Sequence, residues 1–369
     1  MITIKNVKTM EGIVQNFNIP SSKDSEIDAG GKLLLIPGVI DPHISFGSTD
    51  TENWNLAVQS AIRGGITTAI GIPQDDYHHN LKKHLEEKNK KIEKLLKGFG
   101  LSLNHLHYLS FSRENLDEID HLGPQKPLIK GIVIQLEFAK KEVLDARWDH
   151  LFQLAAQEDI PIVINSRNEN NEQWPVASEL GETLLEKAIH FVEKWSNRLF
   201  ILNVSTQKEI HLIQEARLRS LLVYAETTVQ HLFSNDSAKS NYLFEAINND
   251  VIETIGTGFD VDNEGLERVL FKGANFSFSN PAFLLPLLFT AVQHKKITLE
   301  KVIRITSLNI QDLFEITKNQ DFVLVDLEKE QAIQKMYSGE SHEFKLTGWP
   351  AFIIAQGNVF SQPDTGYRL

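Results

Sequence analysis

The sequence predicts an α/β protein, a TIM-type (β/α)8 barrel with a small β-sandwich-like lobe built from both ends of the chain. Two observations support this prediction. Across residues 38–318, short apolar runs rich in β-branched residues alternate with longer stretches of helical spacing. At residues 1–37 and 319–369 the helical alternation is missing and strand-like runs remain. Because strands that alternate with helices form parallel sheets, an eight-stranded barrel is the natural closed form of the central region.

The predicted barrel strands follow one another in chain order, with helical segments between them. The strand-like runs lie at residues 38–46, 65–73, 130–138, 160–166, 198–205, 220–228 and 251–258. Helices are expected at 54–65 and 81–96. In the second helix, leucine and isoleucine fall on one side and lysine and glutamate on the other, which indicates a solvated helix face rather than a binding patch.

The two chain ends predict a separate lobe. Residues 1–37 begin with the strand-like run ITIKNV and continue as a turn-rich stretch to KLLLIPG. The tail contains DFVLVDL, HEFKL and AFIIAQGNVF, a pattern typical of antiparallel strands. We therefore expect residues 1–37 and 319–369 to form one composite β lobe, beside a barrel of residues 38–318.

Charge and composition exclude several classes of protein. The 369 residues carry a formal charge of −12, so nucleic acids and anionic membranes would be repelled. No apolar run approaches the length needed to cross a bilayer, and the N-terminus is typical of a strand rather than a signal peptide. The absence of cysteine removes disulfides, thiolate metal ligands and cysteine nucleophiles. We therefore expect a cytoplasmic protein without nucleic-acid or membrane partners.

Several sequence blocks resemble one family in the same order along the chain. The run LLLIPGVIDPHISF at 33–46 is similar to the first barrel strand of cyclic amidohydrolases, and of dihydroorotases in particular. Further similar blocks lie at 61–74, 203–210, 225–232, 283–309 and 346–360. The resemblance thus covers nearly the whole chain, which is more specific than any single motif.

The resemblance implies a zinc chemistry at the C-terminal mouth of the barrel. In this family one or two metal ions are held by a His-x-His pair, a carboxylated lysine, two single histidines and an aspartate. The metal brings the pKa of bound water towards neutrality, and the aspartate moves the proton.

Read onto this sequence, that ligand set is degenerate. The positions that correspond to the six ligands, in chain order, carry His43, Ser45, Gln135, Asn165, Asn203 and Gly258. Only the first keeps a ligand of the expected type, and the position of the catalytic aspartate is a glycine. Two substrate-clamp positions have also changed, to Gly47 where the family has an arginine and to Gln74 where it has an asparagine. We therefore expect no catalytic residue at these positions, no metal and no cofactor.

Other site chemistries stay open as alternatives. Asp41, Asp260 or Asp262 would be the acids available to an improvised metal site with His43. In the competing interpretation the polar residues at the ligand positions form a neutral hydrogen-bonded cluster. Asp41, Glu226 and Asp260 fall near expected strand ends, so paired-carboxylate chemistry also stays open. A second His-x-His pair, His105 and His107, has no acid nearby in sequence, and we interpret it as structural.

These residues favour a dihydroorotase-like protein that is catalytically inactive and is retained as a non-catalytic subunit or scaffold linked to pyrimidine biosynthesis. The family implies a homodimer, or a complex with a pyrimidine-pathway enzyme such as aspartate transcarbamoylase. One alternative is a residual or altered cyclic-amide hydrolase of dihydroorotase type, which cleaves a C–N bond in a cyclic amide. The other is a metal-free barrel that binds a small ligand.

Overall fold

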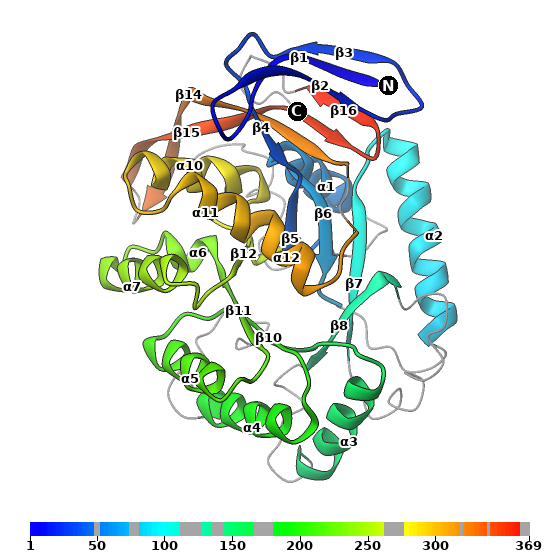
Figure 1. Cartoon of the computed structure of the whole chain (residues 1–369), viewed down its shortest axis with the longest axis vertical. Coiled ribbons are helices and arrows are strands. Elements are labelled where there is room, and N and C mark those ends of the chain that lie inside the picture. Colours follow the sequence, from blue (N-terminus) through cyan, green and yellow to red (C-terminus); the bar gives the residue numbers. More distant parts are fainter. Residues whose placement is uncertain are drawn as a thin grey trace. The chain divides into compact units, whose positions relative to one another are not determined.

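A computed structural model gives the fold of most of the chain (Figure 1). The residues that it describes are 1–47, 52–73, 81–110, 127–134, 144–165, 180–261, 277–317, 320–337 and 340–361. Within these ranges the strands form a larger sheet of nine strands and a smaller sheet of seven. The chain divides into two compact units: unit 1 comprises Met1–Ala69, Leu95–Asn104 and Phe259–Leu369, and unit 2 comprises Ile70–Lys94 and His105–Gly258.

The larger sheet has the strand order β12-β11-β10-β9-β8-β7-β6-β5-β13. Its strands are β5 (Val39–Ser45), β6 (Ile66–Gly71), β7 (Asn104–Ser110), β8 (Ile129–Ile134), β9 (Ile162–Asn165), β10 (Leu199–Leu202), β11 (Val223–Thr228), β12 (Thr254–Gly256) and β13 (Phe259–Asp260). Neighbours in the sheet are therefore neighbours in sequence from β5 to β12. The expected α/β barrel class is confirmed.

Unit 2 contains parallel strands joined by helices. The pairs β7–β8, β8–β9, β9–β10, β10–β11 and β11–β12 are all parallel. Between them run α3 (Leu144–Gln157), α4 (Leu180–Trp195), α5 (Gln207–Leu218), α6 (Val229–Leu232) and α7 (Ser237–Asn248), and α2 (Leu81–Phe99) precedes β7. β10 shows why these runs become strands: all four residues of LFIL are buried, as expected of a parallel strand that is covered on both faces.

Unit 1 carries the first barrel strand and the last. β5 is buried along its whole length, and β13 pairs with it in parallel, with Phe259 opposite Ile44 and Asp260 opposite Ser45. The helical segments of this unit are α1 (Glu52–Arg63), the 3-10 turn η4 (Pro281–Phe283), α10 (Leu284–Gln293), α11 (Leu299–Ile303), the π-helical turn η5 (Arg304–Leu308) and α12 (Asn309–Leu313).

The smaller sheet combines strands from both ends of the chain. Its order is β16-β15-β14-β4-β1-β2, and β3 pairs with β1. The strands are β1 (Ile2–Lys8), β2 (Val14–Ile19), β3 (Ser25–Asp28), β4 (Leu34–Pro37), β14 (Phe322–Tyr337), β15 (Glu340–Ala355) and β16 (Asn358–Ser361). The pairs β14–β15, β15–β16 and β14–β4 are antiparallel. The expected β lobe from both termini is confirmed, whereas its boundaries at 37 and 319 stay a prediction.

A core of its own stabilises the smaller sheet. Buried side chains of β1, β2, β3, β14 and β15 pack together with Ala29, and half-buried leucine, phenylalanine and valine side chains pack against them. Phe17 of β2 and Phe322 of β14 meet edge to face, with 5.2 Å between the ring centroids. Strands that lie about 300 residues apart in sequence are therefore held in one hydrophobic cluster.

Candidate functional site

In unit 1, the candidate site residues lie on β5. Asp41, His43 and Ser45 alternate along the strand and so share one face, and all three are buried. Asp41 Oδ1 accepts a hydrogen bond of 3.0 Å from the backbone N–H of His43. Gly47, which follows the strand at φ +69°, donates its N–H to the Ser45 hydroxyl at 3.4 Å. Asp41 thus fixes the backbone of its own strand.

Asp260 is the acid of β13 that lies opposite Ser45 in the parallel register. Its side chain is half-buried, whereas Asp41 is fully buried. Of these two acids in the described part of unit 1, Asp260 is therefore the more accessible to a ligand near Ser45. The third acid considered, Asp262, lies outside the described residues, as do Gln74 and Gln135.

In unit 2, two ligand positions are joined directly by their side chains. Asn165 ends β9 and Asn203 follows β10, and these strands pair in parallel. The Asn203 Nδ2 amino group donates to Asn165 Oδ1 at 2.6 Å. If both amides were turned over, Asn165 would donate to Asn203 instead, and the contact would still join one amide NH2 group to one amide oxygen. The two positions where the resembling family has imidazoles thus form a neutral amide pair.

Glu226 on β11 fixes the backbone beside this amide pair. Its carboxylate is fully buried, and Oε2 accepts the backbone N–H of Asn203 at 2.7 Å. Asn203 has φ +64°, a left-handed conformation that asparagine tolerates better than most residues. Val204 then donates its N–H to the Glu226 carbonyl at 2.9 Å. From the sequence, Glu226 was one of the acids available for paired-carboxylate chemistry. In the structure its side chain holds the backbone of Asn203.

Gly258, at the position of the family's catalytic aspartate, leaves no room for a side chain. Its φ is +61°, and a Cβ atom added here would lie 2.7 Å from Cγ2 of Thr228. Thr228 ends β11, where its hydroxyl accepts the backbone N–H of His231 at the start of α6. A residue with a side chain at 258 therefore requires both a change of backbone and a shift of Thr228.

Gly258→Ala is therefore expected to lower the free energy of unfolding by about 2 kcal/mol, from the left-handed backbone and the close contact together. In a Thr228→Ser background the cost should fall to about half, because serine lacks Cγ2 yet keeps the hydroxyl that caps α6. Urea denaturation of the four proteins of this double-mutant cycle measures both values. Equal costs in the two backgrounds would contradict the steric contact with Thr228.

These residues do not fit the zinc site that the resemblance implies. Within the described part of the chain, no three His, Asp or Glu side chains are grouped so as to hold a metal ion. The ligand positions offer one imidazole in unit 1, and an amide pair and a glycine in unit 2. Amide oxygens are neutral and weak donors for zinc, and that of Asn165 already accepts a hydrogen bond.

A separate histidine pair lies on β7. His105 and His107 have ring centroids 4.7 Å apart, and His107 Nε2 lies 2.5 Å from Asn89 Oδ1 on α2. Burial lowers the pKa of His105 to about 3 and that of His107 well below its usual value, and Lys88 adds to both shifts. Both rings are therefore neutral at pH 7. Because an amide oxygen only accepts, His107 Nε2 carries the hydrogen in this contact.

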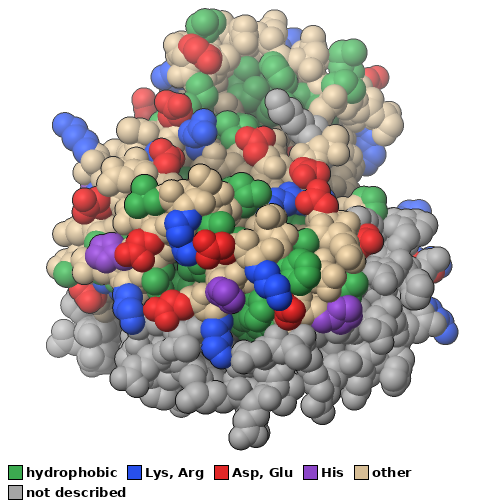
Figure 2. Space-filling view, turned by 60° about the horizontal axis from the view of Figure 1, so that its bottom comes forward, with side chains coloured by type: hydrophobic (Ala, Val, Ile, Leu, Met, Phe, Trp, Pro, Cys, Tyr) green, Lys and Arg blue, Asp and Glu red, His purple; other side chains and the backbone are tan. Residues whose placement is uncertain are grey.

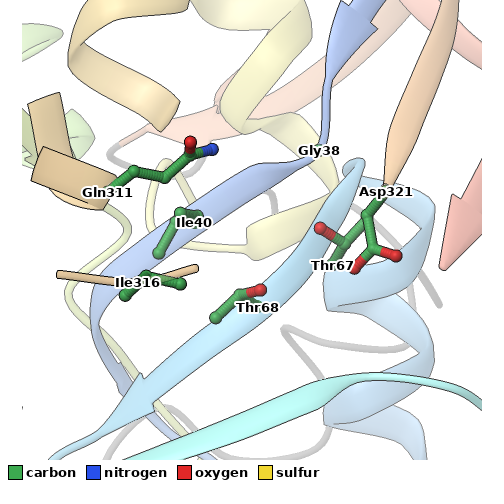
Figure 3. A pocket seen from close by; sticks show the side chains of 7 residues that line it. All are labelled: Gly38, Ile40, Thr67, Thr68, Gln311, Ile316 and Asp321. Atoms are coloured by element: carbon green, nitrogen blue, oxygen red, sulfur yellow. The ribbon is translucent and has the colours of Figure 1, made fainter. Parts of the chain in front are cut away.

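A small pocket in unit 1, lined by both polar and apolar residues, was not foreseen from the sequence. It is lined by Gly38, Ile40, Thr67, Thr68, Gln311, Ile316 and Asp321 (Figure 3). Its volume of about 10 Å³ matches a single water molecule and is too small for an organic substrate. Asp321 and Thr67 lie together on one side of it (Figure 3).

Asp321 links four parts of unit 1. Its carboxylate accepts hydrogen bonds from the backbone N–H of Gln356 at 2.8 Å, from Asn104 Nδ2 at 2.9 Å and from the Thr67 hydroxyl. Its carbonyl accepts the N–H of Gly38 at 2.8 Å. The side chain is only 5% exposed, and burial raises its pKa. These contacts join residues that lie far apart in sequence, so no local sequence pattern predicts them.

Surface charge gives no sign of a polyanion site on the face that is drawn in Figure 2. Lysine, arginine, aspartate and glutamate side chains are interspersed there, without a field of one sign (Figure 2). No helix in the described ranges combines the length and the apolar character that a membrane span requires.

Comparisons with known proteins give a consistent result. No protein-family model matches the sequence. A dihydroorotase of Methanosphaera stadtmanae is 24% identical over 435 aligned residues, which cover 100% of this chain and 98% of that protein. A dihydroorotase of Carboxydothermus hydrogenoformans is 24% identical over 91% of this chain and 88% of its own length. An L-hydantoinase of Paenarthrobacter aurescens is likewise 24% identical, over 91% of this chain and 85% of its own length.

Solved structures agree on the fold. The structure of L-hydantoinase (dihydropyrimidinase) from Arthrobacter aurescens superimposes with a TM-score of 0.73 at 20% identity, covering 98% of this chain and 96% of that one. A D-hydantoinase (dihydropyrimidinase) from a Thermus species gives 0.73 at 15% identity, over 97% and 95% of the two chains. At this level of identity the likeness establishes the fold alone.

Proposed function

We propose, from the premise that this chain is a dihydroorotase-like member of the cyclic amidohydrolases, that it has lost the zinc chemistry of its relatives and serves as a non-catalytic subunit or scaffold. The observation that carries the proposal is the amide pair of Asn165 and Asn203, hydrogen-bonded at 2.6 Å where the resembling family has two imidazoles. A neutral amide pair has little to offer a metal ion, because amide oxygens are weak ligands and that of Asn165 already accepts a hydrogen bond.

Two further observations support the loss. Gly258 stands where the family has the aspartate that moves the proton, and Thr228 occupies the space that the side chain of an acid would need there. Asp41, one of the acids open to an improvised site, accepts the N–H of its own strand. The fold meanwhile matches hydantoinases over almost the whole chain. The proposed loss thus falls on the ligand and substrate-clamp positions, whereas general decay would have affected the packing as well.

The proposed partner is a second copy of the chain or a pyrimidine-pathway enzyme such as aspartate transcarbamoylase. This part rests on the family resemblance. Co-purification with a tagged chain from its native cell extract tests it, with recovery of a transcarbamoylase as the expected result. Recovery of untagged copies of the chain in place of a transcarbamoylase would favour the homodimer.

A second candidate is a residual cyclic-amide hydrolase. The names of the relatives favour it, because dihydroorotases and hydantoinases are enzymes that act on cyclic amides. In an improvised metal site of this kind, Asp260 would be a candidate acid, because it lies opposite Ser45 in the pairing of β13 with β5.

Metal analysis and an activity assay separate the two candidates. We expect the protein, produced in zinc-supplemented medium, to contain less than about 0.1 zinc ion per chain. We also expect it not to convert dihydroorotate and carbamoyl-aspartate into each other. Stoichiometric zinc together with turnover of dihydroorotate would contradict the proposal. His43→Ala is the matched control: turnover that belongs to this chain should be lost with its remaining imidazole, whereas a contaminating host enzyme would be unaffected.

A further inference from the structure

We infer that the small pocket beside Asp321 binds one dehydrated monovalent cation of the size of potassium. The pocket lies entirely within unit 1, and its volume of about 10 Å³ leaves room for a single particle of the size of a water molecule. Ile40 and Ile316 lie on the side away from Asp321 (Figure 3). The other side chains that line it all carry oxygen, the ligand atom that hard cations prefer: Thr67, Thr68, Gln311 and Asp321.

The charge of Asp321 favours a cation as the occupant. The carboxylate is only 5% exposed, and its three hydrogen-bond donors, from Gln356, Asn104 and Thr67, are all neutral. Among the described residues no lysine or arginine is paired with it. A charge that is buried in this way is normally paired or bound to a metal ion, because its lost hydration is otherwise not replaced. A cation in the adjacent pocket supplies the countercharge.

The hydrogen-bond pattern of the lining also favours a cation over a water molecule. The Thr67 hydroxyl donates its hydrogen to Asp321, so only oxygen lone pairs are left on that group. The Gln311 amino group donates to Ser307 Oγ at 2.9 Å, which leaves the amide oxygen as the ligand. A carboxylate offers about four acceptor positions, and the three donors leave at least one of them to the pocket. Lone pairs of this kind bind a cation directly.

Gly38 holds the polar corner of the pocket together. A Cβ atom added here would lie 2.2 Å from Thr67 Oγ1 and 3.0 Å from Asp321 Cβ, so only glycine lets these two residues approach the strand so closely. The Gly38 N–H also donates to the Asp321 carbonyl at 2.8 Å. The oxygen ligands are therefore fixed before an ion enters, which lowers the cost of binding. Because Asp321 precedes β14 and Gly38 precedes β5, the ion would fasten the smaller sheet to the first barrel strand.

The ligands match a monovalent ion rather than a divalent one. Magnesium keeps several of its water molecules, for which the pocket has no room, and calcium takes six to eight oxygen ligands, often from several carboxylates. The pocket instead offers one carboxylate together with neutral oxygens, and neutral oxygens can replace the hydration shell of potassium. Potassium is also close to a water molecule in size. This inference does not rest on the proposed loss of zinc chemistry, because the pocket contains none of the zinc ligand positions.

Thermal unfolding of the full chain tests the inference. After dialysis against a potassium-free buffer, the protein is expected to unfold about 3 °C higher in about 100 mM potassium chloride than in choline chloride of the same ionic strength. Choline is too large for the pocket, so the comparison removes the general effect of salt. Lithium chloride should behave as choline chloride does. Equal unfolding temperatures in potassium and choline would overturn the inference and leave a water molecule as the occupant.

Variants and a heavy analogue of potassium locate the ion. Asp321→Asn should abolish the difference between potassium and choline, and Gln311→Met, which keeps the carboxylate, should reduce it at least by half. Asp312→Asn, at an exposed acid of α12, is the matched control and should keep the full difference. Crystals of the wild-type protein soaked in rubidium chloride should show an anomalous peak beside Asp321. A potassium effect that survives in Asp321→Asn, or rubidium-soaked crystals without this peak, would contradict the inference.

Discussion

Asp321→Ala is expected to lower the free energy of unfolding by about 3 kcal/mol. The substitution leaves three donors without their acceptor, the Gln356 N–H, the Asn104 amino group and the Thr67 hydroxyl, in a site where the carboxylate is 5% exposed. Each unsatisfied buried donor costs about 1–3 kcal/mol, and release of the buried charge offsets part of the sum. Urea denaturation at pH 7 measures the loss, and Asp312→Ala, at an exposed acid of α12, provides the control.

The same carboxyl predicts a pH effect. Burial raises the pKa of Asp321, so the folded protein holds this proton more tightly than the unfolded chain. The contribution to stability is full below the ordinary aspartate pKa and is lost as the pH rises through the raised value. Asp321→Asn, which cannot titrate, should therefore lack this component of the profile. A cost of less than about 1 kcal/mol for Asp321→Ala would show that neighbouring groups or water replace the carboxylate.

Acidification below pH 6.5 is expected to destabilise the protein through His105 and His107. The folded state resists protonation of both rings, since burial lowers the pKa of His105 to about 3 and that of His107 well below its usual value. The unfolded chain takes up these protons near pH 6.5. Stability should therefore fall by up to about 1.4 kcal/mol per pH unit for each histidine between pH 6.5 and the folded pKa.

Three groups on α2 face this histidine pair. Lys88 disfavours a positive charge on both rings and His84 one on His107, and Asn89 Oδ1 lies 2.5 Å from His107 Nε2. His105→Gln/His107→Gln should flatten the acid limb of a plot of unfolding free energy against pH, because glutamine does not titrate. His211→Gln, at an exposed histidine of α5, controls for the loss of a histidine as such. An acid limb as steep as that of the wild type would exclude the pair as its source.

Much of the architecture could be predicted from the sequence because it is written in local patterns. The run RLFILNVS predicted a barrel strand, and β10 lies at Leu199–Leu202 within it. The helix expected at 81–96 is α2, from Leu81 to Phe99. The tail strands are antiparallel as expected. In each case a period of side chains or a cluster of β-branched residues carries the information within about ten residues.

The contacts at the sites could not be predicted in the same way. The resemblance identified Asn165 and Asn203 as ligand positions, yet their hydrogen bond depends on the register of β9 against β10. Glu226 gave no sign that it would hold the backbone of Asn203, and Asp321 none that it would gather donors from Asn104 and Gln356. Such contacts depend on the tertiary placement of side chains that are distant in sequence. The predicted cluster of Ser45 and Gln135 with the two asparagines stays a prediction.

The pairing of β4 with β14 has a consequence for synthesis of the protein. Leu34–Pro37 receives its antiparallel partner only when Phe322–Val325 has been made, 285 residues after Pro37. At about 5–20 residues per second, the first strands wait roughly 15–60 seconds on the ribosome for the partner that completes their sheet. During this interval the edge of β4 that pairs with β14 in the folded protein has no partner in the nascent chain. Ribosome-associated chaperones that shield short apolar strands should therefore affect the yield of this protein more than its final stability.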